Sequence, residues 1–197
     1  MKTKGTTLRK QLVSTMILVA LLAAPGLAAA ETYDVDPIHS AVMFRAKRGV
    51  VYVYGRFNQF SGTLEMQGDD VASGKLTLEV KTPSIDTNNQ QRDDHLRSAD
   101  FLDVANHSTM RFESTGVRAV GEGAYEVTGN LTLRGVTKPV TATVEHVGSG
   151  TDPRTQKKVT GFDATFSLKR TDFGVSALVG PVSDEIDVQI ALHAVAR

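Results

Sequence analysis

Alternating apolar and polar side chains between residues 127 and 145 constrain the fold of this chain more than any other feature. On both sides of a break at Arg134-Gly135, apolar side chains share one parity and polar side chains share the other. The apolar positions are Val127, Leu131, Leu133, Val140, Ala142 and Val144. Because successive side chains of a strand point to opposite faces, this segment predicts two half-buried strands joined as a β-hairpin.

Similar runs recur along the chain between glycine-rich or polar breaks. We expect strands over residues 39–47, 50–57, 63–67, 74–81, 109–120, 159–169 and 185–194. Together with the hairpin they make about eight or nine strands with one polar face each, which pack as an antiparallel barrel or sandwich. The runs follow no fixed repeat, which argues against a solenoid or propeller.

The segment from Pro83 to His107 breaks this pattern, because it is polar and long for a hairpin loop. A short helix fits between residues 86 and 99, where Leu96 offers an apolar contact. Two interpretations stay open here. The segment is a lid over one end of the sheet, or it is a plain crossover between strands.

The first 30 residues have the pattern of a secretory signal peptide. Basic residues between positions 2 and 10 precede an apolar run over residues 12–24, and three alanines at 28–30 fit a cleavage site. The apolar run is shorter than the roughly 20 residues that a membrane-spanning helix needs. We therefore expect cleavage after Ala30 and a single domain over residues 31–197.

Composition removes several classes of function. Without the leader the chain has 18 basic against 22 acidic residues, so it lacks the positive surface that nucleic acids attract. It has no cysteine, which excludes disulfides, thiol catalysis and cysteine-held metal centres. The hydrophobic core alone must hold such a fold together.

No motif typical of a catalytic or metal centre stands out. No pair of the five histidines has the i, i+4 spacing of a helical zinc site. Asp93-Asp94-His95 fits a solvated surface better than a metal site, because adjacent residues of a helix do not converge on one ion. We expect no enzyme activity, no metal and no cofactor.

Eight phenylalanines and no tryptophan are spread over most of the expected strands. If the sheet closes as a barrel of about eight strands, its interior just holds side chains or one small ligand. A filled core and a ligand cavity are both compatible with these residues.

Five segments, taken in their order along the chain, resemble segments of one known family. They are Tyr-Asp-Val-Asp-Pro-Ile-His-Ser at 33–40, Gly-Arg-Phe-Asn-Gln-Phe-Ser-Gly at 55–62, the block 94–103 with 110–114, Gly-Asn-Leu-Thr-Leu-Arg-Gly-Val-Thr-Lys-Pro-Val at 129–140, and 170–174 with 183–186. In this order they resemble the YceI-like family of polyisoprenoid-binding, lipocalin-like periplasmic proteins. One departure is Asn-His-Ser-Thr at 106–109, where the family often has Tyr-Pro or Asn-Pro.

The resemblance implies an all-β, eight-stranded antiparallel lipocalin-like barrel in the periplasm. It implies a carrier that binds a long-chain isoprenoid or fatty lipid inside the barrel and touches the membrane transiently. A homodimer of the protein is also compatible with the resemblance. The expected wall residues are Phe44, Leu76, Leu78, Phe112, Leu131, Leu133, Phe162, Phe166, Ile186 and Ile190. The block 94–102 is expected to gate the cavity.

Three polar residues are candidates for the lipid head group. They are His39, Arg170 and Asp172, of which arginine offers forked donors to an oxygen. An ion pair of Arg170 with Asp172 or Asp184 is the alternative.

Two other functions fit the same residues. An accessory protein or enzyme of isoprenoid-quinone metabolism or envelope stress would need a converging acid–base pair, for which the sequence has no motif. A ligand-free structural stress protein would instead have a filled barrel.

Overall fold

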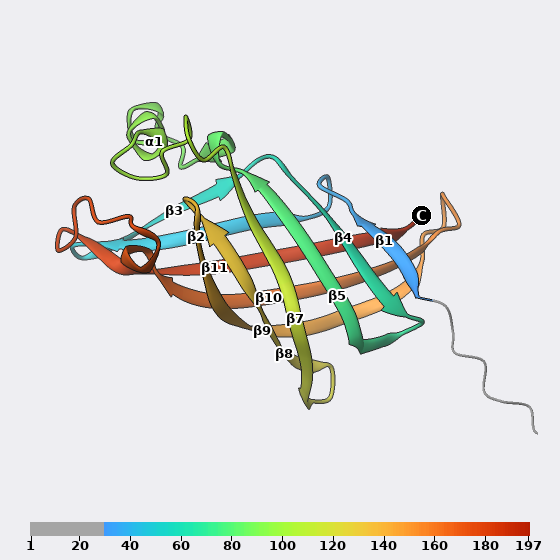
Figure 1. Ribbon diagram of the computed structural model, residues 1–197. Helices are drawn as coiled ribbons and strands as arrows, with labels where there is room; N and C mark the ends of the chain where they lie inside the picture. The colour runs from blue at the N-terminus through green and yellow to red at the C-terminus, as the bar shows by residue number, and fades with distance from the viewer. Residues whose placement is uncertain (1–29) are drawn as a thin grey trace, which may run out of the picture.

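A computed structural model describes residues 30–197 of the chain (Figure 1). The predicted signal peptide lies outside the described residues, except for Ala30. The strands are β1 (Glu31–Val35), β2 (Ala41–Arg48), β3 (Val51–Phe57), β4 (Phe60–Gln67), β5 (Asp70–Lys81), β6 (Ile85–Asp86), β7 (Thr109–Gly121), β8 (Ala124–Leu133), β9 (Val136–Thr151), β10 (Lys158–Lys169) and β11 (Val182–Ala196). The helices are η1 (Thr82–Ser84), α1 (Gln90–Arg97) and η2 (Arg170–Phe173).

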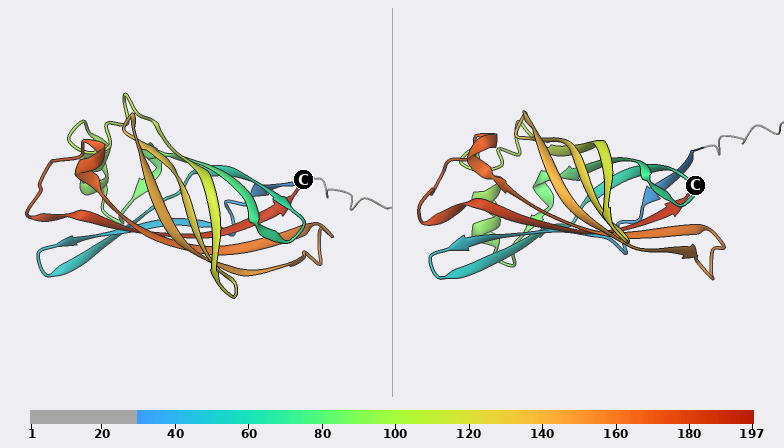
Figure 2. Two further views of the ribbon diagram at one scale, coloured as in Figure 1. Left: turned by 60° about the horizontal axis from the view of Figure 1, so that its bottom comes forward. Right: turned by 90° about the horizontal axis from the view of Figure 1, so that it is seen from below.

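The sheet closes into an eight-stranded antiparallel barrel, which confirms the predicted fold class. The order around it is β1-β4-β5-β7-β8-β9-β10-β11, and β11 pairs back with β1. β2 pairs with β11 between residues 182 and 191 and with β3 along its own length, so the β2–β3 hairpin prolongs the wall at one end (Figure 2). α1 lies at this same end of the barrel (Figure 1), and it confirms the predicted short helix.

The hairpin expected over residues 127–145 forms between β8 and β9. Leu133 pairs with Val136, and the two residues between them have positive φ angles of 52° at Arg134 and 75° at Gly135. Two positive φ angles define the tight turn whose twist matches that of the flanking strands. The Arg134 side chain contributes as well, because its Nη1 donates to the carbonyl of Phe101 at 2.7 Å and ties the turn to the loop after α1.

The end of the barrel away from α1 is closed by side chains. Tyr33, Leu64, Met66, Leu192 and Ala194 form a buried cluster there. At the α1 end, β10 pairs only with residues 143–151 of β9, so the first part of β9 lacks a partner on that side. Phe173 of η2, which is 2% exposed, fills this gap by packing with Leu131 and Leu133.

Candidate ligand-binding site

The barrel encloses a cavity of about 160 Å³. Inward-facing side chains of nearly every strand line it, because the alternation places one face of each strand inside the closed wall. Of the predicted wall residues, Phe44, Leu76, Leu78, Phe112, Leu131, Leu133, Phe162, Phe166 and Ile190 line this cavity. Whether they contact a ligand stays a prediction.

The wall of this cavity is apolar. Among residues 30–197, no acidic or histidine side chain lines it. Ser114 belongs to the wall, but its Oγ accepts the backbone N–H of Leu76 at 2.8 Å. Arg111 also borders the cavity, and its Nη2 donates to Glu113 Oε1 at 2.8 Å. Such a space accommodates hydrocarbon and offers no acid–base pair.

Cavity size limits what can enter. An engineered apolar cavity of about 150 Å³ stays dry and binds one benzene molecule, so the 160 Å³ here holds only a segment of a long chain. The remainder of such a chain would have to extend through an opening.

A second hollow of about 530 Å³ lies at the α1 end and forms the mouth of the barrel. It is lined by Ala46, Arg48 and Val53 of the β2–β3 hairpin, by Thr87, Asn89, Gln91, Arg92, His95, Leu96 and Phe101 of the segment around α1, and by Leu178 and Val182 before or at the start of β11. Phe44 borders both the mouth and the inner cavity. The mouth is therefore polar on its α1 side and apolar where it meets the barrel.

Phe44 lines both spaces. Its ring lies against Gly55 on β3, where an added Cβ would stand 2.3 Å from Phe44 Cζ, and it packs on Phe57 with ring centroids 5.6 Å apart. Since Gly55 has no side chain, the ring can lie close to the strand and leave part of the interior open.

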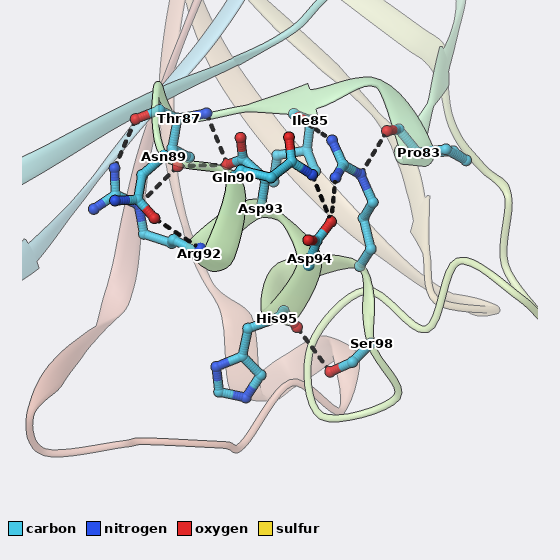
Figure 3. Close-up of polar contacts among 11 residues, drawn as sticks. Pro83, Ile85, Thr87, Asn89, Gln90, Arg92, Asp93, Asp94, His95 and Ser98 are labelled. Atoms are coloured by element: carbon cyan, nitrogen blue, oxygen red, sulfur yellow. Dashed lines mark hydrogen bonds and ion pairs between the residues drawn. The ribbon is translucent and has the colours of Figure 1, made fainter.

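Polar contacts hold α1 on η1 and on the segment that joins η1 to the helix (Figure 3). Arg97 donates from Nε to the carbonyl of Pro83 at 2.8 Å and from Nη2 to that of Ile85 at 2.7 Å. Asp93, which is buried, accepts the backbone N–H of Thr87 at 2.9 Å and its hydroxyl at 2.5 Å. The side chain of Asn89 caps the helix by accepting the N–H of Arg92. The helix α1, which lines the mouth, is thus tied to the barrel rim through residues 83–87.

The remaining predicted wall residue, Ile186, does not line the cavity. It pairs with Leu168 and Ala46 near the open end of the wall and is only half-buried. Val188, one inward position further along β11, lines the cavity instead. Alternation identifies the inner face correctly but does not say where along a strand the cavity ends.

The three head-group candidates lie outside both spaces. Arg170 is 5% exposed, and its guanidinium donates to the backbone carbonyls of Ser183, Val175, Ala177 and Val182 at 2.9, 3.2, 2.6 and 3.3 Å. Asp172 is exposed on η2, and His39 is exposed where the chain passes from β1 to β2. The barrel positions them on its rim and outer wall, and whether any of them meets a lipid head group stays a prediction.

The alternative ion pairs of Arg170 are not formed either. The Asp184 carboxylate accepts the backbone N–H of Thr171 at 3.0 Å and its hydroxyl at 2.8 Å. These hydrogen bonds lower the pKa of Asp184 below its usual value. Burial lowers the pKa of Arg170, and the charge of Asp184 acts in the opposite direction. The Arg170 side chain therefore holds the loop before β11 in place by donating hydrogen bonds to the backbone carbonyls of that loop.

Several site residues were missed by sequence reasoning. Val42, Met66, Val80 and Val144 line the cavity and continue the alternation, so the period-2 pattern could have found them. Arg48 and Arg92 border the mouth. No sequence signal identifies those two, because the sequence does not say which loops meet at the rim.

Within residues 30–197, no helix has both the length and the apolar character needed to cross a bilayer.

A closed eight-stranded barrel with an apolar cavity and a partly polar mouth defines a class of proteins that hold a small apolar ligand inside a barrel. The model of the YceI-like domain matches residues 33–194, and the chain therefore belongs to the YceI-like family. This confirms the resemblance inferred from the five motifs.

Relatives of similar length support the assignment. A UPF0312 protein of Azotobacter vinelandii is 40% identical over 191 residues, which cover 95% of this chain and 98% of the relative. A UPF0312 protein of Pseudomonas aeruginosa is 39% identical over 189 residues, with 94% and 98% covered.

Solved structures share the fold. BcnA of Burkholderia cenocepacia superposes with a TM-score of 0.74 at 25% identity, covering 81% of this chain and 98% of that one. The YCEI protein of Campylobacter jejuni gives 0.69 at 26% identity, with 77% and 89% covered. A polyisoprenoid-binding domain from Saccharophagus degradans, implicated in plant cell wall breakdown, gives 0.62 at 19% identity, with 84% and 98% covered. The last likeness shows the fold alone.

Proposed function

We propose that this protein is a periplasmic carrier that encloses part of a long-chain isoprenoid or similar amphiphilic lipid. The observation that carries the proposal is an inner wall of aliphatic and aromatic side chains that opens at one end into a mouth with polar groups. An amphiphile with a long apolar tail and a small polar head matches this gradient. The polyisoprenoid-binding domain has the same fold, so the fold is compatible with this ligand class.

The energetics favour a ligand that reaches beyond the inner cavity. Each buried methylene contributes about 0.8 kcal/mol, so a segment of about six carbons, the number in the benzene that a cavity of this volume binds, would supply roughly 5 kcal/mol. Association costs roughly 4–15 kcal/mol, and the inner segment alone therefore gives weak binding. A tail that continues past Phe44 into the mouth would supply the remainder, with the head group near Arg48 or the polar residues of α1.

Export to the periplasm is part of the proposal. It is supported by the signal-peptide pattern over residues 1–30. It is also consistent with the start of β1 at Glu31, the residue that would follow the cleavage site. An aqueous compartment between two membranes is where a lipid needs an enclosing carrier.

Transient membrane contact is proposed at the mouth. Val50, Val51, Tyr52 and Tyr54 of the β2–β3 hairpin are 98, 56, 48 and 64% exposed, and Leu178 and Val179 on the loop before β11 are 51 and 48% exposed. Both loops lie at one end of the molecule (Figures 1 and 2). Tyrosine and aliphatic side chains suit a membrane interface. The same apolar patch could instead form the interface of a homodimer. Sedimentation at several protein concentrations would reveal such a dimer.

The experiment is native mass spectrometry with lipid extraction on protein purified from its own envelope. A bound lipid of isoprenoid type at close to one per chain is expected. Leu131→Asp should abolish occupancy by placing a charge on the inner wall, whereas Asn130→Asp, on the exposed outer face of the same strand, should retain it. Ala164→Leu fills the cavity with carbon and tests the same point should Leu131→Asp fail to fold. Empty wild-type protein that does not bind added prenyl lipids would refute the carrier function.

The proposed carrier binds its lipid without converting it. An enzyme of quinone metabolism would convert a prenylated substrate, and a ligand-free stress protein would leave added lipid in solution. Incubation with a prenylated quinone precursor, followed by product analysis, separates the enzyme from the carrier.

A further inference from the structure

A short crossing segment on the outer wall of the barrel joins β1 to β2. Over residues 36–40 the chain leaves the sheet, and it is held to β11 at a single position, His193. The backbone N–H of Asp36 donates to the His193 carbonyl at 2.9 Å, and the N–H of His193 donates to Ser40 Oγ at 2.9 Å. Since Leu192 and Ala194 belong to the core, the His193 side chain points outward.

Three potential metal ligands converge at this crossing. Asp36 Oδ2 lies 2.6 Å from His39 Nδ1 and 3.6 Å from His193 Nδ1. The three ligand atoms all lie within 4.8 Å of one another, and the two imidazole rings meet edge to face with centroids 5.4 Å apart. None of the three residues lines the cavity or its mouth.

One of these atoms lacks a partner. His193 Nδ1 is buried and makes no hydrogen bond to any described residue, and Asp36 Oδ2 is too distant to accept one from it. A buried polar atom left unpaired is costly and needs an explanation. Here it faces a carboxylate and a second imidazole, and a cation between them would satisfy all three.

We propose that Asp36, His39 and His193 bind a divalent transition-metal ion of the zinc class. Two imidazole nitrogens and one carboxylate oxygen are a donor set that such ions favour over magnesium or calcium. Zinc ligands at about 2.0–2.2 Å in a tetrahedron stand about 3.3–3.6 Å apart, and the 3.6 Å between His193 and Asp36 matches this spacing. His39, whose side chain is 60% exposed, has room to move the remaining distance from Asp36.

The site would tie the start of the chain to its last strand. A metal there clamps the β1–β2 crossing onto β11, which is the seam where the barrel closes. Three protein ligands leave a fourth position for water or another small ligand. Because the cluster lies on the outer wall, this inference is independent of the carrier function.

The test uses untagged protein, with Zn²⁺ and Co²⁺ as probes in calorimetric titration and visible absorption. One ion per chain is expected, with the Co²⁺ spectrum of a tetrahedral N,O site. His193→Ala and Asp36→Asn should each weaken binding at least tenfold. Asparagine at position 36 keeps an oxygen for the N–H of Ile38, which Asp36 Oδ1 accepts at 2.9 Å, so the turn is preserved.

The matched control is His107→Ala. His107 also faces an aspartate, with Nε2 3.9 Å from Asp103 Oδ2, but it is not part of a three-ligand cluster among the described residues. Its loss should leave the affinity unchanged. Wild-type protein that binds zinc no tighter than His193→Ala, or an equal loss in His107→Ala, would overturn the site. A second test needs no variant: in NMR spectra of the wild-type protein, Zn²⁺ should shift the ring resonances of His39 and His193. A shift confined to other histidines would likewise reject the proposed site.

Discussion

The ring of Phe112 lies directly on Gly129 of the neighbouring strand, where an added Cβ would stand 2.3 Å from Phe112 Cζ and 2.6 Å from the carbonyl oxygen of Glu113. Phe44 covers Gly55 in the same way. In both pairs the glycine leaves room for an inward-facing ring to lie along the wall. The cavity therefore depends on two positions that carry no side chain as well as on the residues that line it.

Replacing this glycine should reduce both stability and capacity. Gly129→Ala forces the Phe112 ring toward the cavity, and overpacking of this kind costs about 1–3 kcal/mol. Urea unfolding should show that loss, and native mass spectrometry should show lower lipid occupancy. Gly150→Ala is the control, because no heavy atom lies within 4 Å of a Cβ added there. Equal free energies of unfolding for the two variants would mean that the Phe112 ring can move aside without loss of stability.

The inner wall was predictable from sequence because it follows from alternation alone. Leu131 and Leu133 had to share a face with Val127 in any strand, and closure of the sheet made that face the inside. Ile186 obeys the same rule but lies beyond the cavity. The depth at which a cavity ends depends on how the loops pack, which no periodicity encodes.

The polar positions were not predictable, because their roles depend on contacts between distant segments. Arg170 has the chemistry of a head-group ligand, yet the carbonyls around it belong to residues 175–183, whose path the sequence does not reveal. His39 and His193 meet only because β11 closes the barrel next to β1. A search for local histidine spacing could not bring them together.

Loss of the Arg170 guanidinium should loosen the loop before β11. Arg170→Met removes four donations to backbone carbonyls in a buried site, which should cost at least about 2 kcal/mol. Arg170→Lys should recover little, because a single ammonium cannot reproduce the fork. Hydrogen exchange is expected to rise at Val175 and Val182, whose N–H groups donate to the carbonyls of Arg170 and Leu178. Lys169→Met, at the exposed neighbouring position, provides the control, and unchanged exchange in Arg170→Met would contradict the anchoring role.

A charge at the tip of the β2–β3 hairpin should impair delivery of lipid without emptying the barrel. Val50→Glu with Val51→Glu removes the exposed apolar tip beside the mouth, so transfer between phospholipid vesicles should slow at least tenfold while lipid occupancy of purified protein stays unchanged. Val120→Glu is matched in chemistry and lies on the far part of β7, at 46% exposure. Equal transfer by the two proteins would exclude the hairpin as the membrane contact, and equal slowing would indicate a general charge effect.

Tyr33 should make the barrel sensitive to alkali. Burial at 2% exposure, together with a hydrogen bond from its hydroxyl to Glu31 Oε2 at 2.8 Å, raises the pKa of Tyr33 from 10.0 to about 12. The folded protein therefore keeps a proton that the unfolded chain releases above pH 10, and the stability this proton gives is complete below pH 10 and is lost as the pH rises toward 12.

Tyr33→Phe cannot ionise at this position, so its stability should fall less between pH 10 and 12 than that of the wild type. The chain has four tyrosines, and the difference in phenolate absorbance between wild type and Tyr33→Phe isolates the ionisation of Tyr33. A difference that titrates near 10, the ordinary value, would show that the phenol at the closed end of the barrel reaches water in the folded state.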